Sequence, residues 1–361
     1  MERGVSLVRY RKISCESDEF DDIVVNLKND VLSRNNIPKI ILGTGLSASY
    51  GVPGMWELKK KKKRKLEVHP VGKIKKAWKE KETAIDKYGL EEGLKTLNSS
   101  EILLIKEIKK ITAKFILEKE QAKLLEIYNK DTGFEKLLLY LNNTVSVNNG
   151  LIDIMTPNYD RIVEIVCDKC GIPVITGFNG EVFKRFEPLR LKNPGNYVNL
   201  KNNCFVRLFK PHGSINWVLK DNQEYMINDD YYLSQNSDNI EIIAPGSSKY
   251  EAGMLNNTFR LMREDFNELI SDVSKPYSLF IYGYGFNDSH FNTVLFQNKN
   301  KNVLVLSKEI KSAVIDKALN NPKVTIFFQE DKKEYIIYKG ERFEIDRSLW
   351  NMDIFAEVFF S

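Results

Sequence analysis

The sequence predicts an α/β protein: a parallel sheet with an inserted all-helical subdomain. Two observations lead to this fold class. Short apolar runs alternate with stretches of helical periodicity, and one long segment, residues 57–147, shows helical spacing with few strand signals. Strands that alternate with helices indicate a parallel sheet, because a helix connects each strand to the next.

The amino-terminal part predicts one helix and one strand ahead of the helical segment. Residues 18–33 carry apolar side chains such as Phe20, Val24 and Leu27 on one face, which is typical of an amphipathic helix. Residues 37–42 form a short apolar run that ends in Gly-Thr-Gly, which indicates a buried strand entering a tight turn. Within the helical segment we expect several helices, for example over residues 100–129 and 133–141.

Strand signals return after residue 150. We expect strands in the segments LIDIMTPN, PVITGF, CFVRLFKPHG, IEIIAP, YSLFIYGYGF, NVLVLS and KVTIFF. Helices are predicted over residues 159–169, 258–273 and 308–320, and the last thirty residues predict a strand pair and a short aromatic tail. The expected organisation is one unit over residues 1–361, with a core of residues 1–56 and 148–330, the helical insert at 57–147 and terminal strands at 331–361.

Composition places the chain among ordinary globular proteins. It has 361 residues, of which 42% are hydrophobic and 29% charged. The net charge of +5 is too slight to argue for direct nucleic-acid binding. No secretory signal and no apolar run of membrane-spanning length is visible, so we expect a cytoplasmic protein without a membrane partner.

The four cysteines do not form the pattern of a structural zinc site. Cys167 and Cys170 make one C-x-x-C, and no second pair accompanies them. We therefore favour packing roles for these cysteines over zinc binding or redox chemistry, and we expect no metal and no zinc ribbon.

A glycine-rich turn after the first strand is a candidate phosphate-binding loop. Residues 43–48 read Gly-Thr-Gly-Leu-Ser-Ala, which matches G-x-G-x-x-A between a predicted strand and a helix. The backbone N–H groups there can approach a pyrophosphate, and the Ser47 hydroxyl either contacts phosphate or caps the helix. No acidic residue ends a second strand about 20 residues later, which disfavours a hydride-transfer enzyme.

Two further motifs supply an amide, an acid and a base. TPNYDRIVE, residues 156–164, contains Asn158 and Asp160, and FKPHGSINW, residues 209–217, contains His212. Histidine titrates near neutral pH, so His212 can take a proton from a hydroxyl or from water.

These motifs together resemble the sirtuin family. GTGLSASYGVPGMW is similar to the G-A-G-x-S and G-I-P-x-F-R signature, TPNYD to T-Q-N-x-D, and KPHGS to the H-G-S/T motif; IYGYGFNDSH resembles the adenosine-side segment of bacterial sirtuin-like proteins. The resemblance spans about residues 38–320. It implies a Rossmann-like parallel sheet of the sirtuin type and NAD as the substrate.

Departures from the sirtuin pattern indicate which group within the family the sequence resembles most. Met55 and Trp56 replace the motif Phe-Arg, and the zinc-binding cysteines that follow the H-G motif in protein deacylases are absent. What remains is similar to the metal-free sirtuin-like NAD⁺ hydrolases of bacterial antiphage defence. That group often acts with a second protein such as a HerA-type ATPase, so the resemblance implies a homo-oligomer and an activating partner.

The resemblance also assigns roles to individual residues. Asn158 orients water or a ribose hydroxyl, although capping of the following helix is its plain alternative. Asp160 accepts a hydrogen bond from the nicotinamide carboxamide, or only stabilises the first helical turn. His212 is the base. The NAD-binding set comprises Gly43, Thr44, Gly45, Ser47, Pro53, Gly283, Gly285, Asn287, Asp288 and Ser307.

Three functions stay open on the sequence. The first is NAD⁺ hydrolysis to ADP-ribose and nicotinamide. The second is an NAD-dependent protein deacylase or ADP-ribosyltransferase, and the third is a sensor that binds NAD or ADP-ribose without turnover. The lysine run, residues 59–65, is interpreted as a solvated face, with a rim for phosphates or a polyanionic partner as the alternative.

Overall fold

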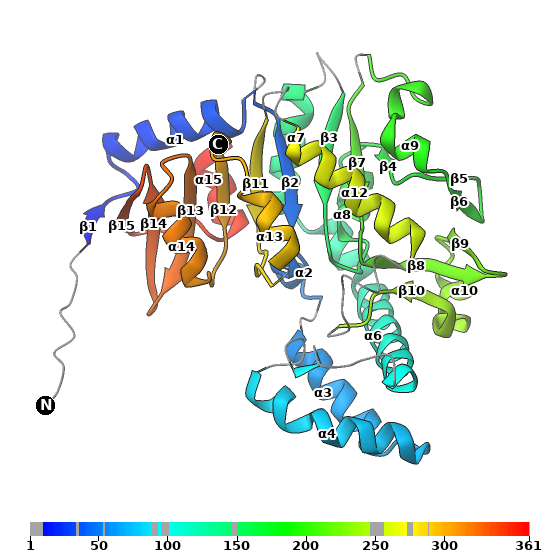
Figure 1. Ribbon diagram of the computed structural model, residues 1–361. Helices are drawn as coiled ribbons and strands as arrows, with labels where there is room; N and C mark the ends of the chain where they lie inside the picture. Colours follow the sequence, from blue (N-terminus) through cyan, green and yellow to red (C-terminus); the bar gives the residue numbers. More distant parts are fainter. Residues whose placement is uncertain are drawn as a thin grey trace, which may run out of the picture. The chain divides into compact units, whose positions relative to one another are not determined.

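The chain forms two compact units, which are described separately (Figure 1). The computed structural model describes residues 10–33, 36–52, 55–88, 93–94, 101–145, 150–201, 203–245, 256–272, 277–287 and 289–360. Unit 1 contains residues 1–41, 131–145 and 270–361, and unit 2 contains residues 42–130 and 146–269. Among the helices of the described residues, none combines the length and the apolar character needed to cross a membrane.

Unit 1 is a sheet flanked by helices. Its strands are β1 (Arg11–Ile13), β2 (Pro38–Leu42), β11 (Ser278–Tyr282), β12 (Val303–Leu306), β13 (Val324–Glu330), β14 (Lys333–Tyr338) and β15 (Glu341–Ile345). They run in the order β1-β15-β14-β13-β12-β11-β2. Strands β11, β12 and β13 are parallel, whereas β13, β14 and β15 form an antiparallel meander. Every residue of β11 and β12 is buried, as expected for parallel strands covered on both faces.

The helices of unit 1 are α1 (Asp18–Val31), α7 (Gly133–Val145), α13 (Ser289–Leu295), α14 (Ser312–Leu319) and α15 (Met352–Phe359). The predicted aromatic tail is the helix α15, which begins where the Asn351 side chain accepts from the Asp353 amide at 2.8 Å. The Phe355 ring packs against Phe327 of β13 and Phe280 of β11. The tail is therefore part of the core of this unit.

Unit 2 contains the remaining parallel strands and a second sheet. Strands β3 (Leu151–Met155), β7 (Phe205–Phe209) and β4 (Val174–Ile175) are parallel, in the order β3-β7-β4. The second sheet is antiparallel, in the order β10-β8-β9-β6-β5, and consists of β10 (Ile240–Ile242), β8 (Gly213–Lys220), β9 (Gln223–Met226), β6 (Lys184–Phe186) and β5 (Phe178–Asn179).

This antiparallel sheet was not predicted. The predicted strand IEIIAP, residues 240–245, overlaps β10 at Ile240–Ile242, while most of β8 and all of β9 lie in a stretch for which no strand was expected. A local signal was present, because Asp221 and Asn222, which join β8 to β9, both adopt a positive φ (52° and 58°). Two such residues form the tight turn that closes a two-residue hairpin.

The helices of unit 2 are α2 (Thr44–Ser49), α3 (Met55–Leu66), α4 (Gly72–Tyr88), α6 (Ile102–Asn129), α8 (Ile162–Lys169), α9 (Pro188–Lys192), α10 (Asp230–Gln235) and α12 (Asn257–Ser271), with short 3₁₀ turns at Pro194–Asn196 and Ser237–Asn239. The described helices between residues 57 and 147 agree with the predicted helical character. Figure 1 shows α6 passing beside α3 and α4.

Helix α6 is apolar on two faces, because it packs against two different layers. Leu104, Ile108 and Phe115 join the core of α3 and α4. Ala113 and Leu117 pack with residues of the antiparallel sheet, such as Ile215 and Val218.

The lysine run on α3 is not a uniformly solvated face. Lys59 pairs with Asp86 at 2.8 Å and Lys63 with Glu82 at 2.7 Å, so these two cations lie at the surface of the helix pair. Lys62 is fully buried, and within the described ranges of the chain its Nζ has no hydrogen-bond partner. Burial lowers the pKa of Lys62 well below its usual range. The interpretation as a solvated face is wrong at this position, because Lys62 follows Leu58 by one turn on the face that meets the core.

Candidate functional site

His212 lies in a tight turn between β7 and β8. The turn runs from Lys210 to Gly213 and is closed by a hydrogen bond from the Gly213 amide to the Lys210 carbonyl at 3.0 Å. Pro211 suits the second position of such a turn because its φ is already fixed. Gly213 has a φ of 83°, and a Cβ there would lie 2.3 Å from the Glu241 carbonyl oxygen. The local sequence K-P-H-G therefore determines where His212 is held.

Two backbone hydrogen bonds connect the His212 turn and the start of β8 to neighbouring segments. The His212 carbonyl accepts from the Ile243 amide at 2.9 Å, and His212 is only 5% exposed. The Tyr159 carbonyl accepts from the Ile215 amide at 2.9 Å, which joins the loop after β3 to the start of β8. The predicted base therefore lies on a buried, hydrogen-bonded turn.

Thr156 organises the loop after β3. Its amide donates to the Phe209 carbonyl at 3.0 Å, which extends the pairing of β3 with β7 by one residue. Its hydroxyl donates to the Leu42 carbonyl at 2.7 Å and accepts from the Asn158 amide at 3.1 Å. One threonine thus ties the end of β2 to the Asn158 loop.

Asn158 is buried and only half satisfied. Its Nδ2 donates to the Gly43 carbonyl at 2.8 Å, whereas its Oδ1 has no hydrogen-bond partner among the residues that the structure describes. The alternative that Asn158 caps the following helix is wrong, because α8 begins at Ile162 and not at residue 159. Asn158 instead connects the glycine-rich turn to the loop after β3 and leaves one acceptor unused.

Asp160 is held by protein groups at both oxygens. Ser47 donates to Oδ2 at 2.5 Å, and the Ile162 amide donates to Oδ1 at 3.3 Å. Burial raises the pKa of the Asp160 carboxyl, while the Lys210 ammonium and the Ser47 hydrogen bond lower it in part. The first-turn contact anticipated as the plain alternative is present. A contact with the nicotinamide carboxamide stays a prediction.

The glycine-rich turn leads into the six-residue helix α2. Gly43 is its N-cap and makes no side-chain cap. Ser47 is buried within α2 and its hydroxyl donates to Asp160, so it does not cap this helix; a contact between Ser47 and a phosphate stays a prediction. Lys130 donates to the Ser49 carbonyl at 2.5 Å, near the carboxyl end of α2, where a cation is favourable. Thr44 and Gly45 lie within α2, and Pro53 lies outside the described residues.

A buried ion pair supports the loop from the α6 side. Arg161 Nε lies 2.6 Å from Glu120 Oε1, and the Arg161 amide donates to the other Glu120 oxygen. Burial raises the pKa of the Glu120 carboxyl, and the Arg161 guanidinium partly offsets this. No sequence signal marked this pair, since its partners are 41 residues apart.

Lys210 is a second residue that the sequence analysis did not single out. It is 1% exposed, and its ammonium bonds Asp160, Ser214 and Glu164. A signal was available, because a lysine ends a strand segment, CFVRLFK, that is apolar except for Arg207.

The rest of the predicted NAD-binding set belongs to unit 1. Gly283 follows β11 with a φ of 59°, and its amide donates to the Leu306 carbonyl at 2.8 Å. Gly285 and Asn287 are exposed, and the Ser307 hydroxyl donates to the Glu309 carbonyl at 2.8 Å. Asp288 lies outside the described residues. These residues gather after the carboxyl ends of β11 and β12, as expected for a nucleotide-binding edge of a parallel sheet.

In the described part of the chain, no three or more His, Cys, Asp or Glu side chains group as metal ligands. Cys15, Cys167, Cys170 and Cys204 all lie in the described part of the chain, and none of them forms a disulfide. Burial raises the pKa of Cys204 to about 11, and burial together with Asp346 raises that of Cys15 to about 12. These two thiols are therefore protonated at neutral pH and are poor metal ligands or nucleophiles.

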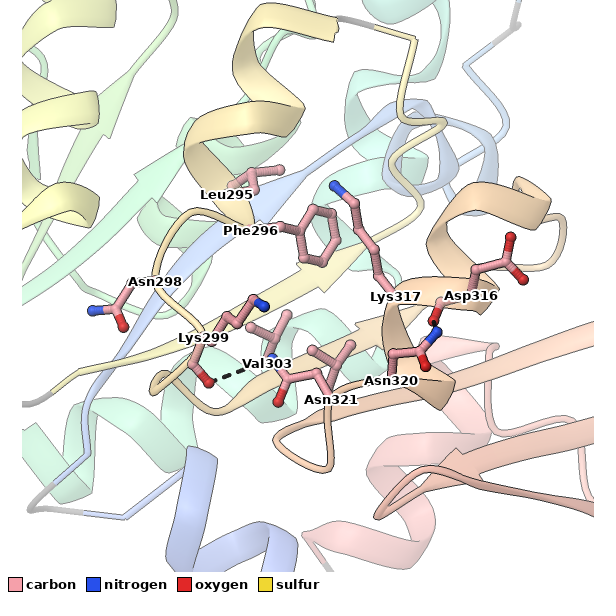
Figure 2. A pocket seen from close by; sticks show the side chains of 10 residues that line it. Leu295, Phe296, Asn298, Lys299, Val303, Asp316, Lys317, Asn320 and Asn321 are labelled. Carbon is pink, nitrogen blue, oxygen red and sulfur yellow. Dashed lines mark hydrogen bonds between the residues drawn. The ribbon is translucent and has the colours of Figure 1, made fainter.

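A surface hollow of about 290 Å³ lies in unit 1, at the opposite edge of the sheet from Gly283 and Ser307 (Figure 2). It is lined by residues at the amino ends of β12 and β13, among them Val303 and Val324. Its asparagines close the surrounding turns: Asn320 donates to the Asp316 carbonyl at 2.7 Å and Asn321 to the Lys299 carbonyl at 3.4 Å. The Lys317 ammonium lies 4.3 Å from the centroid of the Phe296 ring. We assign no ligand to this hollow.

Comparison with known proteins bears on the Asn158 and His212 loops directly. Residues 153–332 match the family model described as SIR2-like domain. This part of the chain is thus similar to a SIR2-like domain. This match supports a sirtuin-like family and points to an NAD-dependent activity. The domain includes both loops and the unit 1 segment after β11.

One solved structure similar to this chain is described as "The Structural basis of Sirtuin Substrate Affinity". It shares 11% identity over 81% of this chain and 87% of its own, with a TM-score of 0.36. No curated protein matches the chain. The SIR2-like domain match is therefore the comparison that bears on function.

Proposed function

We propose that the chain is an NAD⁺ hydrolase that cleaves the bond between nicotinamide and ribose. The observation that carries this proposal is the buried Asn158 Oδ1, to which no group in the described part of the chain donates a hydrogen bond. A buried acceptor left unsatisfied costs about 1–3 kcal/mol. A ribose hydroxyl or a water molecule that donates to this oxygen would remove the cost and be oriented by it.

The position of the Asn158 amide supports the same role. Its Nδ2 is fixed by the Gly43 carbonyl, so the side chain cannot rotate freely and Oδ1 has one direction. Gly43 begins the glycine-rich turn, whose backbone suits a pyrophosphate. One side chain thus links a phosphate-binding element to an acceptor for the reacting ribose.

His212 supplies the base in this proposal. In the reaction the bond between nicotinamide N1 and ribose C1′ breaks, and its electron pair stays on the nicotinamide nitrogen. A water oxygen forms the new bond to C1′, and a water proton passes to His212 and then to solvent. The products are nicotinamide, ADP-ribose and one proton. The ribose passes through an oxocarbenium-like state, so positioning and exclusion of bulk water contribute most.

Product analysis tests the proposal against its alternatives. Purified protein is incubated with NAD⁺ in ¹⁸O-labelled water, and the products are separated by chromatography and weighed by mass spectrometry. Equal amounts of nicotinamide and ADP-ribose carrying one ¹⁸O support hydrolysis. Acyl-ADP-ribose in the presence of an acylated peptide, or ADP-ribosylated protein, supports a transferase instead. Binding without turnover supports a sensor and would end the hydrolase proposal.

We further propose that the enzyme acts in the cytoplasm as an effector of bacterial antiphage defence by NAD⁺ depletion. This role needs gated activity, so we expect a homo-oligomer and an activating protein such as a HerA-type ATPase. Apolar side chains exposed on the helical segment support an assembly, for example Val68 at 76%, Ile102 at 50% and Leu125 at 76%. Light scattering with and without the partner tests this, and a fully active monomer that responds to no partner would contradict it.

A further inference from the structure

Lys210 directly follows β7 and is 1% exposed, which is unusual for a lysine. An ammonium group has three N–H donors. Here each has an acceptor: the Asp160 carbonyl at 2.5 Å, Ser214 Oγ at 2.8 Å and Glu164 Oε1 at 3.1 Å. The hydrogen-bonding capacity of the ammonium is therefore fully used inside the protein.

The three acceptors come from three separate elements. Asp160 belongs to the loop after β3, Glu164 to α8, and Ser214 to the start of β8. The Ser214 hydroxyl in turn donates to the Tyr159 carbonyl at 3.2 Å. Lys210 and Ser214 thus close a small network that joins the two loops on which Asn158 and His212 lie.

A role in folding alone does not account for a buried ammonium. Taking a charge out of water is costly, and a well-packed apolar side chain of similar volume often serves stability as well or better. A single cation whose three bonds reach the loop after β3, α8 and the start of β8 instead fixes the relative position of these elements. Positioning of this kind affects rate strongly, since a displacement of about 1 Å of a reacting group can cost about 100-fold.

We propose that Lys210 is a positioning residue that sets the His212 turn against the Asn158 loop, and that it acts on bond cleavage rather than on substrate binding. It does so without touching NAD⁺. This inference rests on the proposed hydrolase function, because the quantity that it governs is the rate of that reaction.

The test compares Lys210→Met with Ser214→Ala and Glu164→Gln. Lys210→Met removes all three bonds, and we expect kcat to fall about 10- to 100-fold with KM within about 3-fold of the wild type. Ser214→Ala removes one bond and should lower kcat about 3- to 10-fold. Glu164→Gln keeps an oxygen acceptor and should change kcat less than about 3-fold. Lys220→Met is the matched control, since Lys220 is an exposed lysine at the end of β8, the strand that contains Ser214, and the change should leave both constants unchanged.

A kcat unchanged in Lys210→Met, or a rise in KM alone, would overturn the proposal. The double variant Lys210→Met with Ser214→Ala sharpens the result. If both residues act through one network, its kcat should equal that of Lys210→Met alone, whereas multiplied losses would contradict the network. If circular dichroism shows that Lys210→Met does not fold, Ser214→Ala replaces it in the test. A lower kcat with an unchanged KM in Ser214→Ala would then support the proposal, and an unchanged kcat or a rise in KM alone would overturn it.

Failure of the hydrolase function is recognised separately, because the wild-type protein would then release no nicotinamide. In that case, the coupling between Lys210 and Ser214 is measured from the urea unfolding midpoints of the same variants. Midpoint shifts of the two single variants that add in the double variant would refute a lock between the two loops. Shifts that do not add would support it whatever reaction the site performs.

Discussion

The turn after β7 and the segment after β11 begin alike and differ in what surrounds them. Each follows the carboxyl end of a buried parallel strand and contains a glycine with a positive φ, Gly213 at 83° and Gly283 at 59°. In unit 2, the turn is buried, and a Cβ on Gly213 would meet backbone atoms of two residues. In unit 1, Gly285 and Asn287 are exposed, and a Cβ on Gly285 would meet only the Asn287 side chain.

This difference fits a catalytic role for the turn after β7 and a binding role for the segment after β11. A group that moves a proton must be held before the substrate arrives, so its turn is packed and hydrogen-bonded. A segment that contacts a nucleotide must leave its backbone and amides accessible. Changes in the His212 turn should therefore affect kcat and folding, and changes after β11 should affect KM.

The largest effect is expected for His212→Ala. Loss of a positioned base lowers turnover roughly 10²–10⁴-fold, which corresponds to about 3–5 kcal/mol of barrier. Nicotinamide release measures it. His69→Ala is the matched control, because His69 lies in the helical segment between α3 and α4 and should retain full activity. A folded His212→Ala protein with more than about half the wild-type rate would remove His212 from the mechanism.

Asn158→Ala should come next. Its orphaned Oδ1 is proposed to gain its partner as the bond breaks, so kcat should fall about 10²–10³-fold while NAD⁺ binding stays measurable. Steady-state kinetics together with calorimetric titration of NAD⁺ separates the two quantities, and Asn199→Ala at an exposed position of unit 2 is the control. A normal kcat with raised KM would show that Asn158 only binds substrate.

Gly213→Ala tests the packing of the turn rather than its chemistry. The added Cβ meets the Glu241 carbonyl at 2.3 Å at a positive φ, so we expect a loss of more than about 2 kcal/mol in the free energy of unfolding. Gly171→Ala is the matched control, since φ is 67° but nothing lies within 4 Å of the new Cβ. It should cost only about 1 kcal/mol. Equal losses in urea unfolding would mean that the turn is not tightly enclosed.

Asn287→Ala should have a smaller effect of the opposite kind. If the segment after β11 binds the adenosine side of NAD⁺, loss of one exposed amide should raise KM about 3- to 10-fold, or about 1 kcal/mol, with kcat unchanged. Initial rates over a range of NAD⁺ concentrations give both constants. A fall in kcat at constant KM would contradict the assignment of binding to the segment after β11.

The smallest effect is expected from a chelator. One C-x-x-C without a second pair predicts that metal removal changes neither the unfolding midpoint nor NAD⁺ turnover. Elemental analysis is the direct measurement. One zinc per chain would contradict this prediction and favour the deacylase alternative.

The α/β class, the buried strands and the His212 turn were predictable because their signals are local. Alternating apolar runs and helical stretches indicated the fold class. Pro211 and Gly213 fix a turn within four residues, so the loop that carries His212 followed from the sequence alone. The helix α1 was likewise predictable from apolar spacing, and it ends within two residues of its expected bound.

Other features depended on partners distant along the chain. Asn158 was predicted as a site residue, which stays a prediction, but its Gly43 partner is 115 residues away, and this contact could not be read from the sequence. The start of α8 was predicted three residues early, because Asp160 and Arg161 are held by Ser47 and Glu120 instead of entering the helix. Lys62 was predicted to be solvated because it lies in a run of lysines. In the structure it is buried, because α3 packs with this face against the core.

The sequence by itself determined the α/β class, the turn that presents His212 and the residue types of the proposed site. The tertiary structure alone decided how these residues are held: which Asn158 atom is left without a partner, that Ser47 bonds Asp160, and that Lys210 joins two loops. The physical reason is the range of the interactions. Backbone preferences and hydrophobic periodicity act over a few residues, whereas the burial and pairing of polar groups depend on which segments the fold brings together.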